Sequence, residues 1–193
     1  RNLRTIQQEL GITTIMVTHD QEEAFELADR MGVMSFGRLI EVDTPANLYC
    51  YPQTEFVAAF LGTANLMVGQ ATTDGVQLGP RHFPLKALPT SVAVDNAQRV
   101  QVLFRPEDVL LAGHAGELDC PPLGQGKVEQ ITFGGSFERL RVRLPPIPGV
   151  RPIAPPIAFG EHGLVVEVTR TQDQVSRLPL QQTDTVWAGI SRL

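Results

Sequence analysis

The sequence of 193 residues has few of the residue types on which several classes of function depend. Its two cysteines, Cys50 and Cys120, lie far apart without metal-ligand spacing, so we expect reduced thiols rather than a disulfide or a zinc site. Aromatic residues make up 6% of the chain and the net charge is −5, which argues against a nucleic-acid surface. No apolar run approaches the roughly 18 residues of a membrane span. If the protein works at a membrane, another subunit must attach it.

The most informative stretch lies between residues 13 and 31. Residues 13–18 are β-branched and apolar, which predicts a strand covered on both faces, and the pattern becomes polar at His19. Asp20 can cap a following helix, with Glu23 as its capping-box partner. Four residues then recur at helical spacing and predict one buried face: Ala24, Leu27, Ala28 and Met31. His19 would therefore stand at the carboxyl end of a strand, where open α/β sheets bind ligands.

A single histidine in such a place is weak evidence, but the residues around it resemble a known family. Val-Thr-His-Asp-Gln-Glu-Glu-Ala at residues 17–24 resembles the H-loop region of ATP-binding cassette (ABC) ATPases, specifically those of bacterial importers. The resemblance continues in register through Ala28-Asp29-Arg30, Gly37-Arg38, Asp43-Thr44-Pro45 and residues 56–62. It implies that His19 is the switch histidine, which contacts the γ-phosphate of ATP bound with Mg²⁺ and helps to position the attacking water. Phosphoryl transfer depends on such positioning and on electrostatic stabilisation.

The other motifs of such an ATPase are missing from these residues. We find no Gly-x-x-x-x-Gly-Lys-Ser/Thr phosphate loop, no Leu-Ser-Gly-Gly-Gln signature and no apolar strand ending in Asp-Glu. We therefore expect the chain to be the carboxyl-terminal part of a longer ATPase and to be inactive by itself.

The first third of the chain predicts further short elements. Residues 1–10 have near-helical apolar spacing, and residues 32–42 read as two strands joined at Gly37. Thr44-Pro45 and Thr54 are typical helix starts, which predicts helices up to Tyr49 and up to Leu61. Gly62 closes the second of these helices.

From residue 64 onward helical periodicity gives way to short alternating runs between Gly, Pro and Asp. Asp74-Gly75 and Gly134-Gly135 are hairpin signals. We expect strands at residues 66–72, 75–78, 99–105, 126–133, 137–144, 164–169 and 186–190, a spacing that indicates a small barrel. Residues 102–109, with Arg105-Pro106-Glu107, resemble the TOBE domain, an oligonucleotide-binding (OB)-type barrel appended to many importer ATPases. The fold class expected is thus an α/β remnant of a P-loop NTPase (ABC) domain, residues 1–62, followed by an all-β, OB-like TOBE barrel, residues 63–193.

For several charged residues of the second half, we compare a functional role with a structural one. Arg105 and Glu107 are interpreted as a structural ion pair at a strand end rather than a catalytic pair. Arg139, Arg141 and Arg143 alternate on one strand face, which predicts a solvated face balanced by local glutamates, with an anion-contacting surface as the alternative.

Six of the twelve residues from 145 to 156 are proline, in a place where the family usually has a shorter turn. This density excludes helix and predicts a stiff surface spacer, with a partner-binding insertion as the alternative. The three remaining histidines show no metal spacing and receive no role: His82, His114 and His162.

The resemblance implies the ATP-binding subunit of an ABC importer, which couples ATP hydrolysis to solute uptake. Such a subunit would form a homodimer, dock on transmembrane permease subunits at the cytoplasmic face of the membrane, and serve an extracytoplasmic solute-binding protein indirectly, with no nucleic-acid partner. The alternative is a non-enzymatic regulatory or small-anion-binding OB-type module. Polyamine, ferric iron, phosphonate-like anion and sugar all remain open as the solute.

Overall fold

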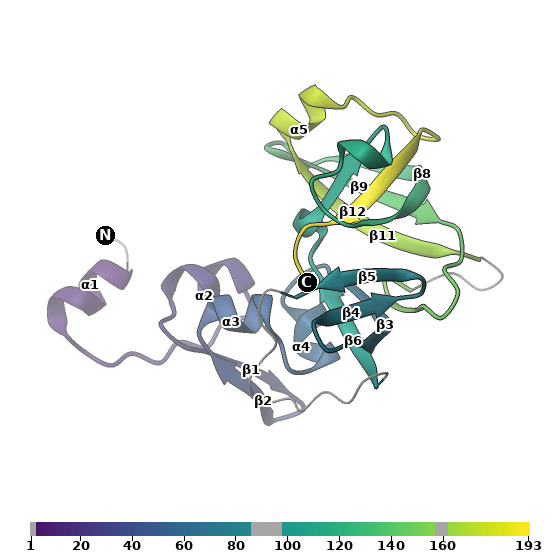
Figure 1. The fold of residues 1–193 in the computed structure, drawn as a ribbon. Coiled ribbons are helices and arrows are strands. Elements are labelled where there is room, and N and C mark those ends of the chain that lie inside the picture. The colour runs from purple at the N-terminus through teal and green to yellow at the C-terminus, as the bar shows by residue number, and fades with distance from the viewer. Residues whose placement is uncertain (1–2, 86–97, 157–161) are drawn as a thin grey trace. The chain divides into compact units, whose positions relative to one another are not determined.

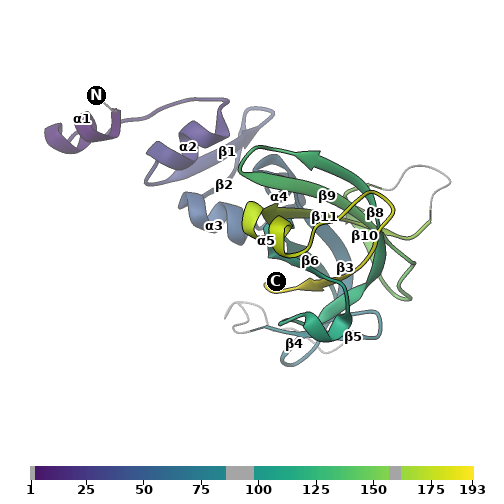
Figure 2. The same cartoon turned by 90° about the horizontal axis from the view of Figure 1, so that it is seen from above.

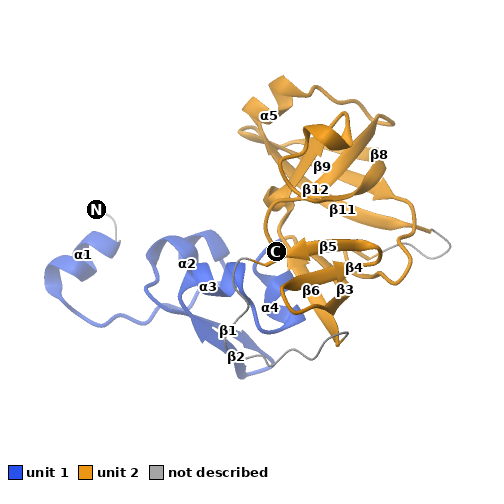
Figure 3. Cartoon of the chain, in the orientation of Figure 1, with its two compact units in different colours: residues 1–62 blue, residues 63–193 orange. Residues whose placement is uncertain are grey.

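The computed structural model describes residues 3–85, 98–156 and 162–193 (Figure 1). They form two compact units, residues 1–62 (unit 1) and residues 63–193 (unit 2), which Figure 3 colours separately. Each unit has a hydrophobic cluster of its own.

Unit 1 combines short helices with one hairpin. Its elements are α1 (Leu3–Leu10), α2 (Gln21–Leu27), β1 (Met31–Ser35), β2 (Arg38–Asp43), α3 (Pro45–Cys50) and α4 (Glu55–Phe60). The strands β1 and β2 pair antiparallel through a turn at Phe36 and Gly37, which both have positive φ, 47° and 73°. The expected helix starts are confirmed, because Thr44 Oγ1 accepts the N–H of Asn47 and Thr54 Oγ1 accepts that of Val57.

The core of unit 1 is small. Its buried members are Met31, Val33, Leu48, Val57 and Leu61, and α2 adds partly buried side chains to them. The ring of Phe25 on α2 meets that of Tyr49 on α3 edge to face, with the centroids 5.9 Å apart.

Two expectations for unit 1 are wrong. The helix expected to reach Met31 ends at Leu27, because Met31 instead begins β1 and pairs with Asp43. The strand expected at residues 13–18 is not formed, and Ile15 and Val17 are 90% and 93% exposed. A strand requires a neighbour that bonds its N–H and C=O groups. Among the described residues, no strand pairs with this segment.

Unit 2 contains two antiparallel sheets (Figure 2). The first runs in the order β10 (Arg151–Ala154), β3 (Asn65–Ala71), β4 (Gly75–Leu78) and β5 (Arg81–Pro84), and β6 (Arg99–Phe104) also pairs with β3. The second runs in the order β11 (Leu164–Thr171), β9 (Phe137–Leu144), β8 (Pro122–Phe133), β12 (Thr185–Ile190) and β7 (Val109–Ala112). Two short 3-10 helices, η1 (Pro106–Asp108) and η2 (Ala115–Glu117), and the helix α5 (Gln172–Arg177) complete the unit.

The second sheet curls until its edges meet. Its edge strand β11 contacts β7 at the opposite edge and η1 beside it, so the five strands approach a closed barrel. The seven strands expected from the sequence are confirmed, five of them with shifted ends. Three strands of four residues each, β5, β7 and β10, were not expected, and β4 is equally short but was marked by the hairpin signal Asp74-Gly75.

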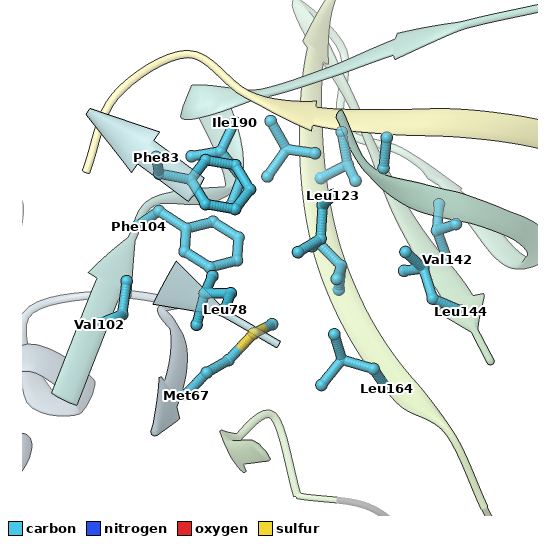
Figure 4. Close-up of a cluster of buried hydrophobic side chains, with 14 of the residues drawn as sticks. Met67, Leu78, Phe83, Val102, Phe104, Leu123, Val142, Leu144, Leu164 and Ile190 are labelled. Carbon is cyan, nitrogen blue, oxygen red and sulfur yellow. The ribbon is translucent and has the colours of Figure 1, made fainter. Parts of the chain in front are cut away.

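Both sheets contribute to one hydrophobic core. In Figure 4 side chains of the first sheet lie opposite those of the second: Met67, Leu78, Phe83 and Phe104 face Leu123, Leu164 and Ile190. The two phenylalanines are 2% and 1% exposed, respectively. Unit 2 therefore owes its stability to packing between the sheets as well as to strand pairing.

The proline-rich segment lies at the surface, as the sequence predicts, but it is more than a spacer. It contains no helix, as expected, but Ile147 and Val150 pack against the core and Arg151–Ala154 forms β10. The apolar residues between the prolines cause this difference, because burying them is favourable.

Candidate functional site

His19 lies in a bend directly before α2. Thr18 Oγ1 accepts the backbone N–H of Asp20 at 3.0 Å, and Asp20 Oδ1 accepts the N–H groups of Glu22 and Glu23 at 2.9 and 3.2 Å. The sequence prediction that Asp20 caps this helix is confirmed, but Glu23 is not its capping-box partner, because the Asp20 N–H donates to Thr18 instead. The His19 side chain is exposed, and no hydrogen bond to it is found within the described residues. The bend thus presents an imidazole to solvent, while the carboxylate of Asp20 satisfies the helix N–H groups.

Among the residues that the structure describes, His19 is exposed and is not part of an enclosed site. A shallow depression of about 450 Å³ lies nearby in sequence, lined by Gln7, Gln8, Gly11, Ile12, Thr13, Thr14 and Asp29, and it does not include His19. Asp29, at one border of this depression, pairs with the guanidinium of Arg4, which also donates to the carbonyl of Glu26. The imidazole can donate a hydrogen bond to a ligand or accept one from it.

Unit 1 also exposes large apolar side chains, and two groups of them stand out. One is the segment of residues 12–17, and the other is the outer side of the β1–β2 hairpin, with Met34 and Leu39 61% and 58% exposed and Phe36 at the turn fully exposed. Exposed apolar surface of this kind is typical of a face that another polypeptide segment covers.

The arginines of β9 are engaged with partners in unit 2. Arg141 Nε lies 3.1 Å from Glu167 Oε1, Arg143 pairs with Glu129, and the Arg139 guanidinium lies 4.8 Å from the centre of the Phe137 ring. Burial raises the pKa of Glu167, although Arg141 and Arg139 act in the opposite direction. The interpretation as a face balanced by glutamates is therefore confirmed for Arg141 and Arg143.

A groove of about 380 Å³ lies along this face. It is lined by Gln125, Gly126, Lys127, Glu129, Arg143, Leu144, Pro145, His162 and Thr185. Arg143, the guanidinium best placed to receive an anion, contacts Glu129 and also donates to the carbonyl of His162 at 3.2 Å. Because its charge is matched by a carboxylate, Arg143 does not by itself define an anion site in this groove.

Arg105 is buried and bonds to groups of unit 2, which supports a structural role. It is 1% exposed, its Nη1 donates to the carbonyl of Thr63 at 3.2 Å, and its backbone N–H donates to Asp108 Oδ2 at 3.2 Å. Its pairing with Glu107 stays a prediction. The described residues contain no group of three or more His, Cys, Asp or Glu side chains placed to hold a metal ion.

Both cysteines are free thiols, as expected. Burial raises the pKa of Cys120, and the nearby Asp119 raises it further, so this thiol stays protonated at neutral pH.

Two important polar residues were missed by the sequence reasoning. Asn65 is fully buried, and its side chain bonds both backbone groups of Glu167, 102 positions along the chain. Asp108 is 8% exposed, its carboxylate pairs with Arg192, and its carbonyl accepts both the N–H and the hydroxyl of Ser191. No local pattern marks Asn65, because its partner is distant in sequence. Asp108 has one local partner, the N–H of Arg105, but its contacts with Ser191 and Arg192 are equally distant.

No protein-family model matches the chain, but individual relatives do. It is 38% identical over 150 residues to the sulfate/thiosulfate import ATP-binding protein CysA 2 of Chromobacterium violaceum, covering 77% of this chain and 39% of that protein. It is 37% identical over 146 residues to the spermidine/putrescine import ATP-binding protein PotA of Pseudomonas fluorescens, covering 74% and 39%. The chain thus spans about two fifths of the length of the curated relatives it matches.

A third relative is archaeal. The glucose import ATP-binding protein GlcV of Saccharolobus solfataricus is 36% identical over 141 residues, which cover 72% of this chain and 38% of that protein. Among solved structures, the cytoplasmic molybdate-binding protein ModG with molybdate bound is 16% identical, with a TM-score of 0.45, over 66% of this chain and 91% of that one.

These relatives are import ATP-binding proteins, so the class to which the chain is related is that of ATP-dependent importers. More narrowly, its homologues are the ATP-binding subunits of ABC importers, and the resemblance stated from the sequence is confirmed. The expected fold class, an ABC-type α/β remnant followed by an OB-like barrel, is confirmed as well. No helix among the described residues combines the length and apolar character that crossing a bilayer requires.

Proposed function

We propose that this chain is part of the ATP-binding subunit of an ABC importer, in which ATP hydrolysis drives solute uptake. The observation that carries the proposal is the extent of the sequence likeness. Unit 2 is 131 residues long, residues 63 to 193, whereas the likeness to CysA 2 extends over 150 residues. The matched region must therefore include residues of both units, and a shared barrel alone does not account for it.

In this proposal residues 1–62 are the carboxyl-terminal part of the nucleotide-binding domain, and residues 63–193 are its TOBE domain. The exposed segment of residues 12–17 supports this assignment. Its apolar side chains would be covered in a complete nucleotide-binding sheet, which would stabilise that sheet by about 1.5–3 kcal/mol for each fully buried valine or isoleucine. The strand expected at residues 13–18 would then form, with His19 at its end.

His19 is the residue that we assign to the reaction. Its imidazole would donate a hydrogen bond to the γ-phosphate of ATP and so stabilise the charge that develops during phosphoryl transfer. ATP and Mg²⁺ would be held mainly by residues outside this chain, since its described residues contain neither a phosphate loop nor a metal-binding cluster.

The partners follow from the same proposal. The whole protein would act as a homodimer bound to transmembrane permease subunits at the cytoplasmic face of the membrane, with an extracytoplasmic binding protein delivering the solute. The names of the relatives refer to sulfate or thiosulfate, spermidine or putrescine, and glucose. These solutes differ in charge and size, so the likeness supports the importer class and not a particular solute.

The test uses the complete protein that contains this chain, assembled with its permease. We expect His19→Ala to lower ATP hydrolysis and solute uptake by about 10²–10³-fold, as for loss of one transition-state donor, while ATP affinity changes by less than about threefold. His114→Ala is the matched control, because His114 is an exposed histidine of unit 2 with no assigned role. Normal hydrolysis in the His19 variant would refute the role of His19.

A separate observation tests the importer assignment itself. The coding sequence that precedes Arg1 should encode a phosphate loop, a signature motif and an acidic strand end. If an intact gene lacks all three, the alternative of a non-enzymatic module replaces the ATPase.

A further inference from the structure

The proline-rich segment connects the two sheets of unit 2. The chain leaves the second sheet at Leu144, the last residue of β9, and enters the first sheet at Arg151, the first residue of β10, which pairs with Val68 of β3. Residues 145–154, which we call the strap, therefore run from the barrel to the other sheet.

The strap lies directly on the turn of a hairpin. Gly79 and Pro80 form the two-residue turn between β4 and β5, where Leu78 pairs with Arg81 and Gly79 has a φ of +60°. A methyl group at Gly79 would lie 2.5 Å from Ile147 Cγ2 and 2.6 Å from the carbonyl oxygen of Pro148. The close contact between strap and turn therefore requires that position 79 has no side chain.

The composition of the strap suits this contact. Its prolines restrict the unfolded chain, so that less conformational entropy is lost on ordering than for a flexible loop. Ile147 and Val150 supply the apolar contact and pack against the shared core, and the N–H of Val150 donates to the carbonyl of Ile147 at 3.1 Å.

We propose that the strap is a latch that controls opening of the β4–β5 hairpin. The hairpin carries Leu78 and Phe83, which are 0% and 2% exposed, so its opening would uncover part of the core. The hairpin also has a polar connection to the barrel, because Arg81 Nη1 donates to the carbonyl of Pro122 at 3.0 Å. With the strap in place, the hairpin opens only together with the barrel; with the strap displaced, the hairpin opens alone. This inference does not depend on the importer assignment.

The experiment compares two glycine variants of the full chain by amide hydrogen exchange with mass spectrometry. Gly79→Ala places a methyl group against the strap, and we expect the amides of residues 75–84 to exchange about tenfold faster or more, while those of β8 and β9 are unchanged. Gly135→Ala is the matched control, because Gly135 has a similar φ of +80° but no atom within 4 Å of the added methyl group. It imposes the same backbone strain without touching the strap.

A second variant removes the strap's side of the contact without adding strain. Ile147→Ala should also accelerate amide exchange of residues 75–84 about tenfold, with the barrel amides unchanged. This variant provides the test if Gly79→Ala does not fold. The proposal is overturned if Ile147→Ala leaves hairpin exchange at the wild-type rate. It is equally overturned if hairpin and barrel amides accelerate by the same factor, because the strap would then affect only global stability.

Discussion

Replacement of Asn65 by alanine tests how the two sheets of unit 2 are joined. The Asn65 side chain, on β3, bonds the middle of β11 as a strand would: Nδ2 donates to the carbonyl of Glu167 at 2.9 Å, and Oδ1 accepts the N–H of Glu167 at 2.8 Å. Asn65 is fully buried, so water does not replace these bonds readily. The variant leaves one backbone N–H and one C=O without these partners.

The expected loss of stability follows from these two backbone groups of Glu167. Each buried polar group left unsatisfied costs about 1–3 kcal/mol, so we expect Asn65→Ala, which leaves two of them, to lower the free energy of unfolding of unit 2 by about 2–6 kcal/mol. Asn65→Asp keeps the shape and the acceptor but loses the donor to the Glu167 carbonyl and adds a buried charge. It should therefore destabilise unit 2 at neutral pH as well.

Denaturant unfolding followed by tryptophan fluorescence is a suitable assay. The chain has a single tryptophan, Trp187 on β12, so the signal reports on unit 2 and not on unit 1. Gln130→Ala, at an exposed position of β8, is the control and should lie within about 0.5 kcal/mol of the wild type. If Asn65→Ala also lies within that margin, the two bonds do not hold the sheets together and the reasoning fails.

Two further predictions concern Glu167 and Thr54. Because burial raises the pKa of Glu167 above its ordinary value of 4.5, the folded state binds its proton more tightly than the unfolded state does. The resulting stabilisation is present at low pH and is lost as the pH rises through the folded pKa. In Glu167→Gln, which cannot ionise, the free energy of unfolding of unit 2 should therefore decrease less as the pH rises above 4.5. An unchanged pH profile of Trp187-monitored unfolding would contradict this. Thr54 Oγ1 accepts the N–H of Val57 at 3.2 Å and donates to Glu41 Oε1 at 2.6 Å, so Thr54→Ala should destabilise α4 by about 1 kcal/mol and Thr54→Ser much less. Faster amide exchange in α4 would show this, and equal exchange in the two variants would refute the capping role.

The sequence predicts well those features that neighbouring residues determine. Asp20, Thr44 and Thr54 begin their helices because a side-chain oxygen reaches an N–H two or three residues later. Gly37 supports the expected hairpin for an equally local reason, since it adopts a positive φ.

Features that depend on distant partners were not predictable from the pattern. The bonds between Asn65 and Glu167, and the contact of Ile147 with Gly79, join residues far apart in sequence. The strand pattern of residues 13–18 fails for a related reason. Its β-branched and apolar residues favour an extended chain, but a strand forms only beside another strand, which the described residues do not provide.

The exposed segment of residues 12–17 also affects how strongly the polypeptide self-associates in solution. An exposed apolar stretch that pairs with no strand among the described residues is a template on which an identical molecule can add, edge against edge. Concentrated samples of these 193 residues are therefore prone to precipitate through this stretch, and a lysine in place of Ile15 is the natural way to keep them dispersed.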